Sequence, residues 1–186
     1  FDVLPDGRLL SVSPSGEVRI QSAVNSSSYI TTNEVAAPNS SGFGASFLRV
    51  SPDGSRVALG NNEFNSGNAV LVYDFAEFTL GLGLGNPVLP QVTITTPNFD
   101  ADWAGSSTLF VTGASGTTFT PVVNRLDVPS GTSGTFISPA GGFSGGVAVE
   151  GETLLVGDGQ SGQVRAFDTA AFLPPPLAFT AGDLAA

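Results

Sequence analysis

A chain of 186 residues is long enough to form a domain with a hydrophobic core, and its 24 Gly and 13 Pro residues favour a fold with many tight turns. Six Arg and no Lys stand against 16 acidic residues, so the net charge of −10 argues against binding to nucleic acids or to anionic membranes. Because Cys and His are absent, disulfides, thiolate or imidazole metal sites and histidine-based catalysis are excluded.

The first of four similar units covers residues 1–45. Its turn, Pro5-Asp6-Gly7, leads into an apolar stretch at 9–12, and a second such stretch follows at 18–21. Both stretches are rich in aliphatic residues and are bounded by Gly, Pro or Ser. This pattern predicts two β-strands joined by a turn.

The second unit, residues 46–97, shows the pattern most completely. Its turn is Pro52-Asp53-Gly54. A long polar loop is expected over 60–67, and a short helix within 75–82. The predicted strands of this unit lie at 46–50, 56–59, 68–74 and 91–95.

The third and fourth units, residues 98–143 and 144–186, keep the strands but change the turn. Gly105 and Gly151 follow the first strand of these units, and neither belongs to a Pro-Asp-Gly sequence. Two further strands are predicted in each of these units. They lie at 109–111 and 125–127 in the third unit and at 154–156 and 164–168 in the fourth.

A unit of about 45 to 50 residues built from short strands is typical of the blades of a β-propeller. In the second unit, residues 47–58 contain Ser-Pro-Asp-Gly before a strand, and the strand at 70–74 ends in Asp. These segments resemble the repeat of bacterial WD40-like and YVTN, or lactonase-type, propellers. The resemblance covers nearly the whole chain and is weakest in the third unit. It implies an all-β propeller of four-stranded antiparallel blades, with residues 1–186 as a single propeller domain or segment.

The number of blades leaves two arrangements open. Four blades can close a ring, but the families that this chain resembles more often close with six to eight blades. A first residue other than Met also favours a segment of a longer protein. We therefore expect part of a larger propeller, whose ring is completed by further blades or by self-association, rather than a complete ring of four.

Two glycine-rich stretches match catalytic or nucleotide-binding patterns without their structural context. Residues 142–146 fit G-x-S-x-G, but no His is available as a base and a strand follows. Residues 157–162 fit G-x-G-x-x-G, but the next residues also form a strand rather than a helix. We interpret the first stretch as a loop and the second as a hairpin turn.

Oxygen atoms are the only metal ligands that this composition offers, and they suit Ca²⁺ or Mg²⁺. In a propeller, the first strands line the central channel, and loops gather around its mouth. Asp2, Arg49 and either Asp100 or Asp102 fall near equivalent first-strand positions. The sequence therefore predicts a site at the channel mouth. Its candidate residues are Glu63, Asp100 and Asp102 as metal ligands, and Arg49, Asn61, Asn62 and Asp158 as other ligand-binding residues.

Several other polar and aromatic residues have structural interpretations. Arg19, Arg125 and Arg165 sit at similar strand positions in three units, where they are expected to pair with neighbouring acids. Trp103, the single Trp, is expected to pack between blades.

Three functional hypotheses remain. The first is a noncatalytic propeller that binds a protein, a glycan or a small ligand through its loop face. The alternative is a lactonase-like hydrolase with Ca²⁺ or Mg²⁺ at the channel mouth, where the ion polarises a carbonyl and orients a water. A third is a structural repeat module of a larger protein. No segment is long and apolar enough to span a membrane, and a secreted or bacterial envelope location is favoured.

Overall fold

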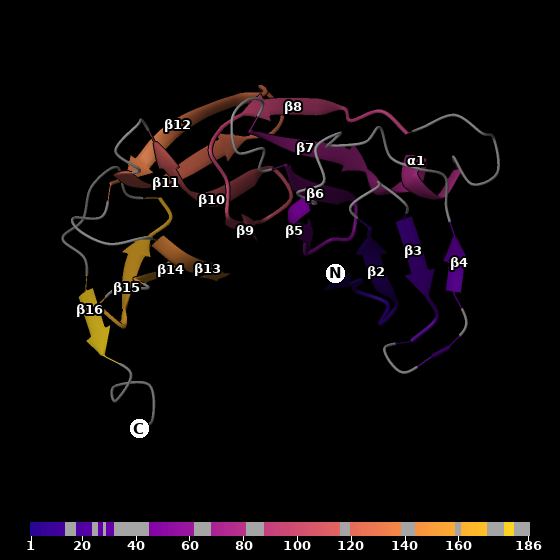
Figure 1. The fold of residues 1–186 in the computed structure, drawn as a ribbon, viewed down its shortest axis with the longest axis horizontal. Coiled ribbons are helices and arrows are strands. Elements are labelled where there is room, and N and C mark those ends of the chain that lie inside the picture. Colours follow the sequence, from indigo (N-terminus) through magenta and orange to yellow (C-terminus); the bar gives the residue numbers. More distant parts are fainter. Residues whose placement is uncertain are drawn as a thin grey trace. The chain divides into compact units, whose positions relative to one another are not determined.

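The computed structural model consists of four antiparallel sheets and, within the described residues, one short helix (Figure 1). Among these residues no helix has the length and apolar character needed to cross a membrane. The structure describes residues 1–13, 18–23, 26–27, 29–31, 45–61, 68–80, 88–115, 120–138, 144–158, 161–170 and 177–180.

The chain forms two compact units, and unit 1, Phe1–Thr95, holds the first two sheets. Helix α1 (Phe75–Leu80) follows β7, within the range where a short helix was expected. The strands of the first sheet are β1 (Asp2–Val3), β2 (Leu9–Val12), β3 (Val18–Gln21) and β4 (Tyr29–Thr31). The strands of the second sheet are β5 (Ala45–Val50), β6 (Arg56–Asn61), β7 (Ala69–Asp74) and β8 (Val92–Thr95).

Unit 2, Thr96–Ala186, holds the other two sheets. The strands of the third sheet are β9 (Asp100–Ala104), β10 (Thr108–Ser115), β11 (Thr120–Asp127) and β12 (Thr132–Ile137). The strands of the fourth sheet are β13 (Ser144–Glu150), β14 (Thr153–Asp158), β15 (Gln163–Asp168) and β16 (Leu177–Thr180).

All four sheets have the same topology, in which each strand pairs antiparallel with the next strand in the sequence. This up-and-down order is that of a propeller blade. The all-β prediction of four-stranded antiparallel blades is therefore confirmed.

Glycine closes the turn between the first and second strands of every sheet. Gly7 and Gly54 have φ angles of 85° and 72°, and the N–H of each donates a 2.8 Å hydrogen bond to the carbonyl at the start of its turn. Gly105 and Gly151 take the same left-handed conformation in the third and fourth sheets, with φ of 69° and 58°. Because glycine adopts positive φ without steric cost, Gly105 and Gly151 supply the turn even where Pro-Asp is missing.

Each unit has its own apolar core between its two sheets. In unit 1 the core includes Leu10 and Ile20 of the first sheet with Leu59 and Tyr73 of the second, all at most 4% exposed. The core of unit 2 joins Phe110 and Val123 of the third sheet to residues of the fourth, which are Val147, Leu154, Val156 and Phe167. Trp103 is 3% exposed, so it is packed inside the protein.

Candidate functional site

The first-strand carboxylates of the sequence prediction link neighbouring sheets within each unit. Asp2 accepts hydrogen bonds from the backbone N–H of Val3 at 2.8 Å and of Val50, on β5, at 2.8 Å. Asp102 repeats this geometry, since it accepts from Trp103 at 2.9 Å and from Val149, on β13, at 2.7 Å. Each of these carboxylates therefore joins its own strand to the first strand of the next sheet.

Asp100 makes a similar link two residues earlier on β9. Its Oδ2 atom accepts the N–H of Val147 at 3.2 Å. A Cβ atom added to the neighbouring Gly146 would lie 3.3 Å from the same oxygen, so little space remains beside it. Asp100 and Asp102 are thus brought together on one strand, with each carboxylate directed at the backbone of β13.

The strand registers identify which residues are equivalent. Asp2 lies opposite Leu10 and Asp102 lies opposite Phe110, and the two residues hold equivalent positions of their first strands. Arg49, opposite Ala58, holds this position in the second sheet. In the fourth sheet it is held by Ala148, opposite Leu155.

The other predicted ligand-binding residues lie in separate places. Arg49 is half-buried on β5, and its guanidinium donates to the carbonyl of Leu48 at 3.0 Å. Asn61 ends β6, whereas Asn62 and Glu63 lie outside the described residues. Asp158 occupies the position of the fourth sheet equivalent to Asn61, as the last residue of the second strand.

Asp158 organises the hairpin between β14 and β15. Its Oδ1 atom accepts the N–H of Ser161 at 3.1 Å, and its Oδ2 atom lies 3.7 Å from the guanidinium of Arg165. The glycine-rich stretch that begins at Gly157 therefore enters a hairpin, as the sequence predicts. Within the described ranges, no three acidic side chains gather into a group that could hold a metal ion. The predicted Ca²⁺ or Mg²⁺ site stays a prediction.

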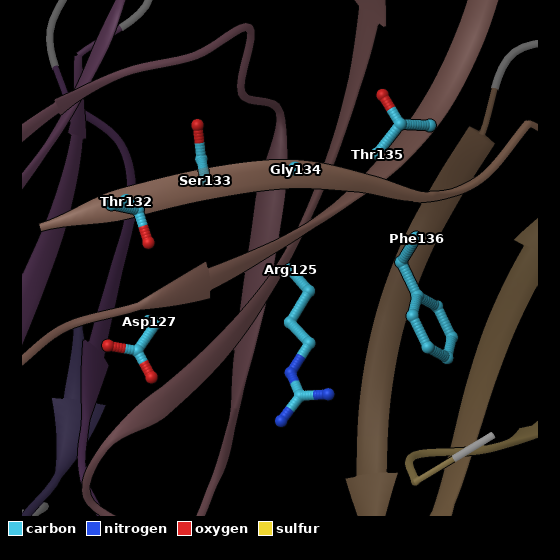
Figure 2. A pocket seen from close by; sticks show the side chains of 7 residues that line it. All are labelled: Arg125, Asp127, Thr132, Ser133, Gly134, Thr135 and Phe136. Carbon is cyan, nitrogen blue, oxygen red and sulfur yellow. The ribbon is translucent and has the colours of Figure 1, made fainter. Parts of the chain in front are cut away.

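A hollow of about 490 Å³ lies on the third sheet, where β11 and β12 run side by side (Figure 2). Figure 2 shows Arg125, Asp127 and Phe136 pointing to one side of these strands, with Ser133 and Thr135 pointing to the other. The residues that line the hollow are Arg125, Asp127, Thr132, Ser133, Gly134, Thr135 and Phe136.

The hollow results from a departure from the repeat. In the third sheet, Arg125 of β11 lies opposite Gly134 of β12, in the row of paired residues that starts at Asp102. The other three sheets have two apolar residues in this place, and in the first sheet Ile20 is 4% exposed within the core. The apolar pairs are Ile20–Ile30, Val72–Val92 and Ala166–Leu177.

An irregularity in β12 directs an aromatic ring toward the same face. Thr135 lies opposite Asn124 and Ile137 lies opposite Val123, so Phe136 is the extra residue of a β-bulge. Its ring meets that of Phe110 edge-on, with the centroids 5.0 Å apart. Phe136 is thereby held as one wall of the hollow.

Within the described ranges, Arg125 forms no ion pair in this hollow, although its charge acts on the nearby Asp127. The side chain is half-buried, and no carboxylate or carbonyl among the described residues lies at hydrogen-bond distance from its guanidinium. Arg165, by contrast, pairs with Asp158. Burying charged surface without a partner is unfavourable, so an anionic ligand would find Arg125 already partly desolvated.

Asp127 belongs to the rim of the hollow and stays ionised. Its carboxylate accepts the hydroxyl of Ser130 at 2.6 Å and the backbone N–H of Ser130 at 2.9 Å. These bonds, with a smaller contribution from the charge of Arg125, hold the pKa of Asp127 below its usual value. The rim therefore presents one negative charge beside one positive charge.

The sequence prediction for Arg125 was wrong in its register. Arg19 and Arg165 lie opposite Ser11 and Val156, which are equivalent, whereas Arg125 lies opposite Phe110, one residue away. A shift of one residue places a side chain on the opposite face of a sheet. Arg125 therefore points to the face on which the other sheets carry apolar residues, and no acid among the described residues forms the expected ion pair with it.

Comparisons with known proteins bear on the fold. No family model and no curated protein matches this chain. Among solved structures, U3-55K is 15% identical, with a TM-score of 0.66 over 96% of this chain and 50% of that chain. A chain of the nidogen/laminin complex is 8% identical, with a TM-score of 0.64 over 95% of this chain and 62% of that chain. The computationally designed Ika4 protein is 10% identical, with a TM-score of 0.53 over 89% of this chain and 88% of that chain.

The fold is that of a β-propeller. At these sequence identities the comparisons show the fold alone. The chain spans half the length of the U3-55K chain and less than two thirds of the chain from the nidogen/laminin complex. The four sheets are propeller blades, and the hollow lies on the outer two strands of the third blade.

Proposed function

We propose that this propeller is a noncatalytic scaffold that binds a partner protein, and that the hollow at Arg125 and Gly134 receives a carboxylate of that partner. The observation that carries the proposal is the replacement, in one blade of four, of an apolar pair by Arg and Gly. A cation and a missing side chain at this place weaken blade packing, so a role in binding accounts for them better than a role in stability.

The chemistry of the hollow suits a carboxylate. A guanidinium offers its N–H groups as a planar fork that matches the two oxygens of a carboxylate. The ring of Phe136 and the hydroxyl group of Thr132 add apolar and polar contacts at the rim. The propeller in the nidogen/laminin complex supports a protein as the partner, because that structure contains two different proteins.

Within the propellers, the Ser-Pro-Asp-Gly turn at Ser51 supports membership of the WD40-like or YVTN group. Ser51 accepts the N–H of Gly54 through its carbonyl, and its hydroxyl donates to Asp53 at 2.7 Å, so the whole motif builds this turn. With this group we propose a secreted or bacterial envelope location. Binding at the third blade would add to any binding at the loop face.

Titration of the ¹⁵N-labelled protein with N-acetylglutamate amide, followed by NMR, tests the proposal. We expect the Arg125 side-chain N–H and the Gly134 amide to shift in a saturable way. The Arg125→Met variant should lose the shifts at Gly134. Arg19→Met, which removes the same charge from an exposed position of unit 1, should keep them. If neither the Arg125 nor the Gly134 signal moves, the proposed binding site is wrong.

A further inference from the structure

Resting on the proposed function, we infer that the partner presents its carboxylate on an extended peptide, which adds as a fifth strand to the open edge of β12. One acidic side chain of the peptide passes over Gly134 and pairs with Arg125. The inference combines three features of the third blade: an unprotected strand edge, a gap in its side chains, and a cation beyond that gap.

The edge of β12 is open to pairing. The strand stands last in its sheet and, within the described part of the chain, pairs only with β11. Its residues Thr132 to Thr135 are exposed. Proteins commonly protect such edges with charged residues or Pro, and β12 contains neither. It also has six residues, whereas the fourth strands of the other sheets have three or four.

Gly134 provides the passage from this edge to the cation. It lies directly opposite Arg125, and an added Cβ atom would find no heavy atom within 4 Å. A peptide residue paired with Gly134 would lie about 9.6 Å, or two strand spacings, from the backbone of Arg125. A long acidic side chain and the Arg125 side chain can meet across that distance only because no side chain stands between them.

Charge limits the peptide to few acids. The protein carries a net charge of −10, so a run of acids would be repelled. Asp127 lies two residues from Arg125 on the same strand and therefore on the same face. A second acid two residues from the first, on the side of Thr132, would face Asp127, which is paired with Thr132. Together with the net charge, this favours a single acid among uncharged residues.

Fluorescence anisotropy with a labelled seven-residue peptide tests the inference. The probe has alternating Thr and Val residues with one central Glu, and its partner has Gln in place of Glu. We expect the Gln peptide to bind at least about tenfold more weakly, because it loses the charge-assisted hydrogen bonds. Gly134→Val should cause a similar loss by filling the passage. Thr93→Val, a comparable change at an exposed position of β8 in the second sheet, should leave binding within about twofold.

Methylation of the peptide backbone then tests strand addition itself. In a paired strand, alternate N–H groups point to the neighbour, and the others point away. Two peptides methylated on alternate nitrogens, in opposite phase, should therefore differ, with only one of them losing binding. If both phases bind as tightly as the parent peptide, or both lose binding, strand addition is wrong.

The outcomes separate the inference from the proposed function. If N-acetylglutamate amide shifts the Gly134 signal but no peptide binds, the carboxylate site stands and the extended peptide is wrong. If neither the small carboxylate nor the Glu peptide binds, both are wrong. Binding that is equal for the Glu and Gln peptides would overturn the role of Arg125 in this recognition.

Discussion

Replacing Asp102 by Ala should lower the free energy of unfolding of unit 2 by about 2–4 kcal/mol. The substitution removes a half-buried carboxylate that accepts the N–H of Val149 at 2.7 Å and of Trp103 at 2.9 Å. A hydrogen bond to a charged group contributes about 1.5–3 kcal/mol, and water that reaches the half-exposed Val149 recovers part of this. Asp102→Asn, which keeps one acceptor oxygen, should cost about 1–2 kcal/mol.

Urea unfolding followed by tryptophan fluorescence measures this change. Trp103 is the single Trp and is 3% exposed, so its emission reports the unfolding of unit 2. Glu152→Gln removes the same charge from an exposed turn of the unit and serves as the control. A loss for Asp102→Ala no larger than that of the control would refute the argument that the carboxylate joins the two sheets.

Three further predictions follow from other contacts. Gly113→Ala should lower the free energy of unfolding, measured in urea, by about 1–3 kcal/mol or more, because the added Cβ would lie 2.4 Å from the carbonyl oxygen of Pro97. Gly134→Ala, whose Cβ would have no heavy atom within 4 Å, should lower it by less than about 0.5 kcal/mol. The pKa of Asp127 is lowered from 3.8 in the folded state, so its carboxylate stabilises the fold above that pH. The stability lost in Asp127→Asn should therefore vanish as the pH falls through the lowered pKa. A difference in unfolding free energy that persists at the lowest pH would contradict this. Calcium should leave the melting temperature unchanged relative to EDTA, because the β9 carboxylates already accept backbone N–H groups. Stabilisation of the fold by about 2.7 kcal/mol, at about a hundredfold excess of calcium over its dissociation constant, would instead support the metal-dependent hydrolase hypothesis.

Local patterns in the sequence were sufficient to predict the blades. Turns such as Pro52-Asp53-Gly54 are short-range features, and the aliphatic strand that ends at Asp74 carries its own signal. β12 was not predicted, because its first four residues are Thr, Ser, Gly and Thr, and only Phe136 and Ile137 at its end are apolar. Its formation depends on pairing with β11, which is a tertiary effect that a local pattern does not contain.

The candidate site was largely beyond the sequence for a related reason. The hollow depends on Arg125 standing one residue out of step with Arg19 and Arg165, and that offset is set by the length of the connection between β10 and β11. The role of Asp102 was likewise hidden, since its partner Val149 is 47 residues away. The near equivalence of Asp2, Arg49 and either Asp100 or Asp102, by contrast, was predicted from the sequence, and the strand registers single out Asp102.

The carboxylate links between first strands occur in alternate blades. Asp2 and Asp102 stand in the first and third blades, whereas Arg49 and Ala148 hold this position in the second and fourth. The described links therefore fall inside the two compact units of the chain. Dissection between residues 95 and 96 severs none of the three links described for Asp2, Asp100 and Asp102, whereas a cut between the two sheets of either unit severs at least one. The fragments 1–95 and 96–186 are thus the natural pieces for expressing this protein in halves, and shuffling of its blades between proteins should proceed in twos.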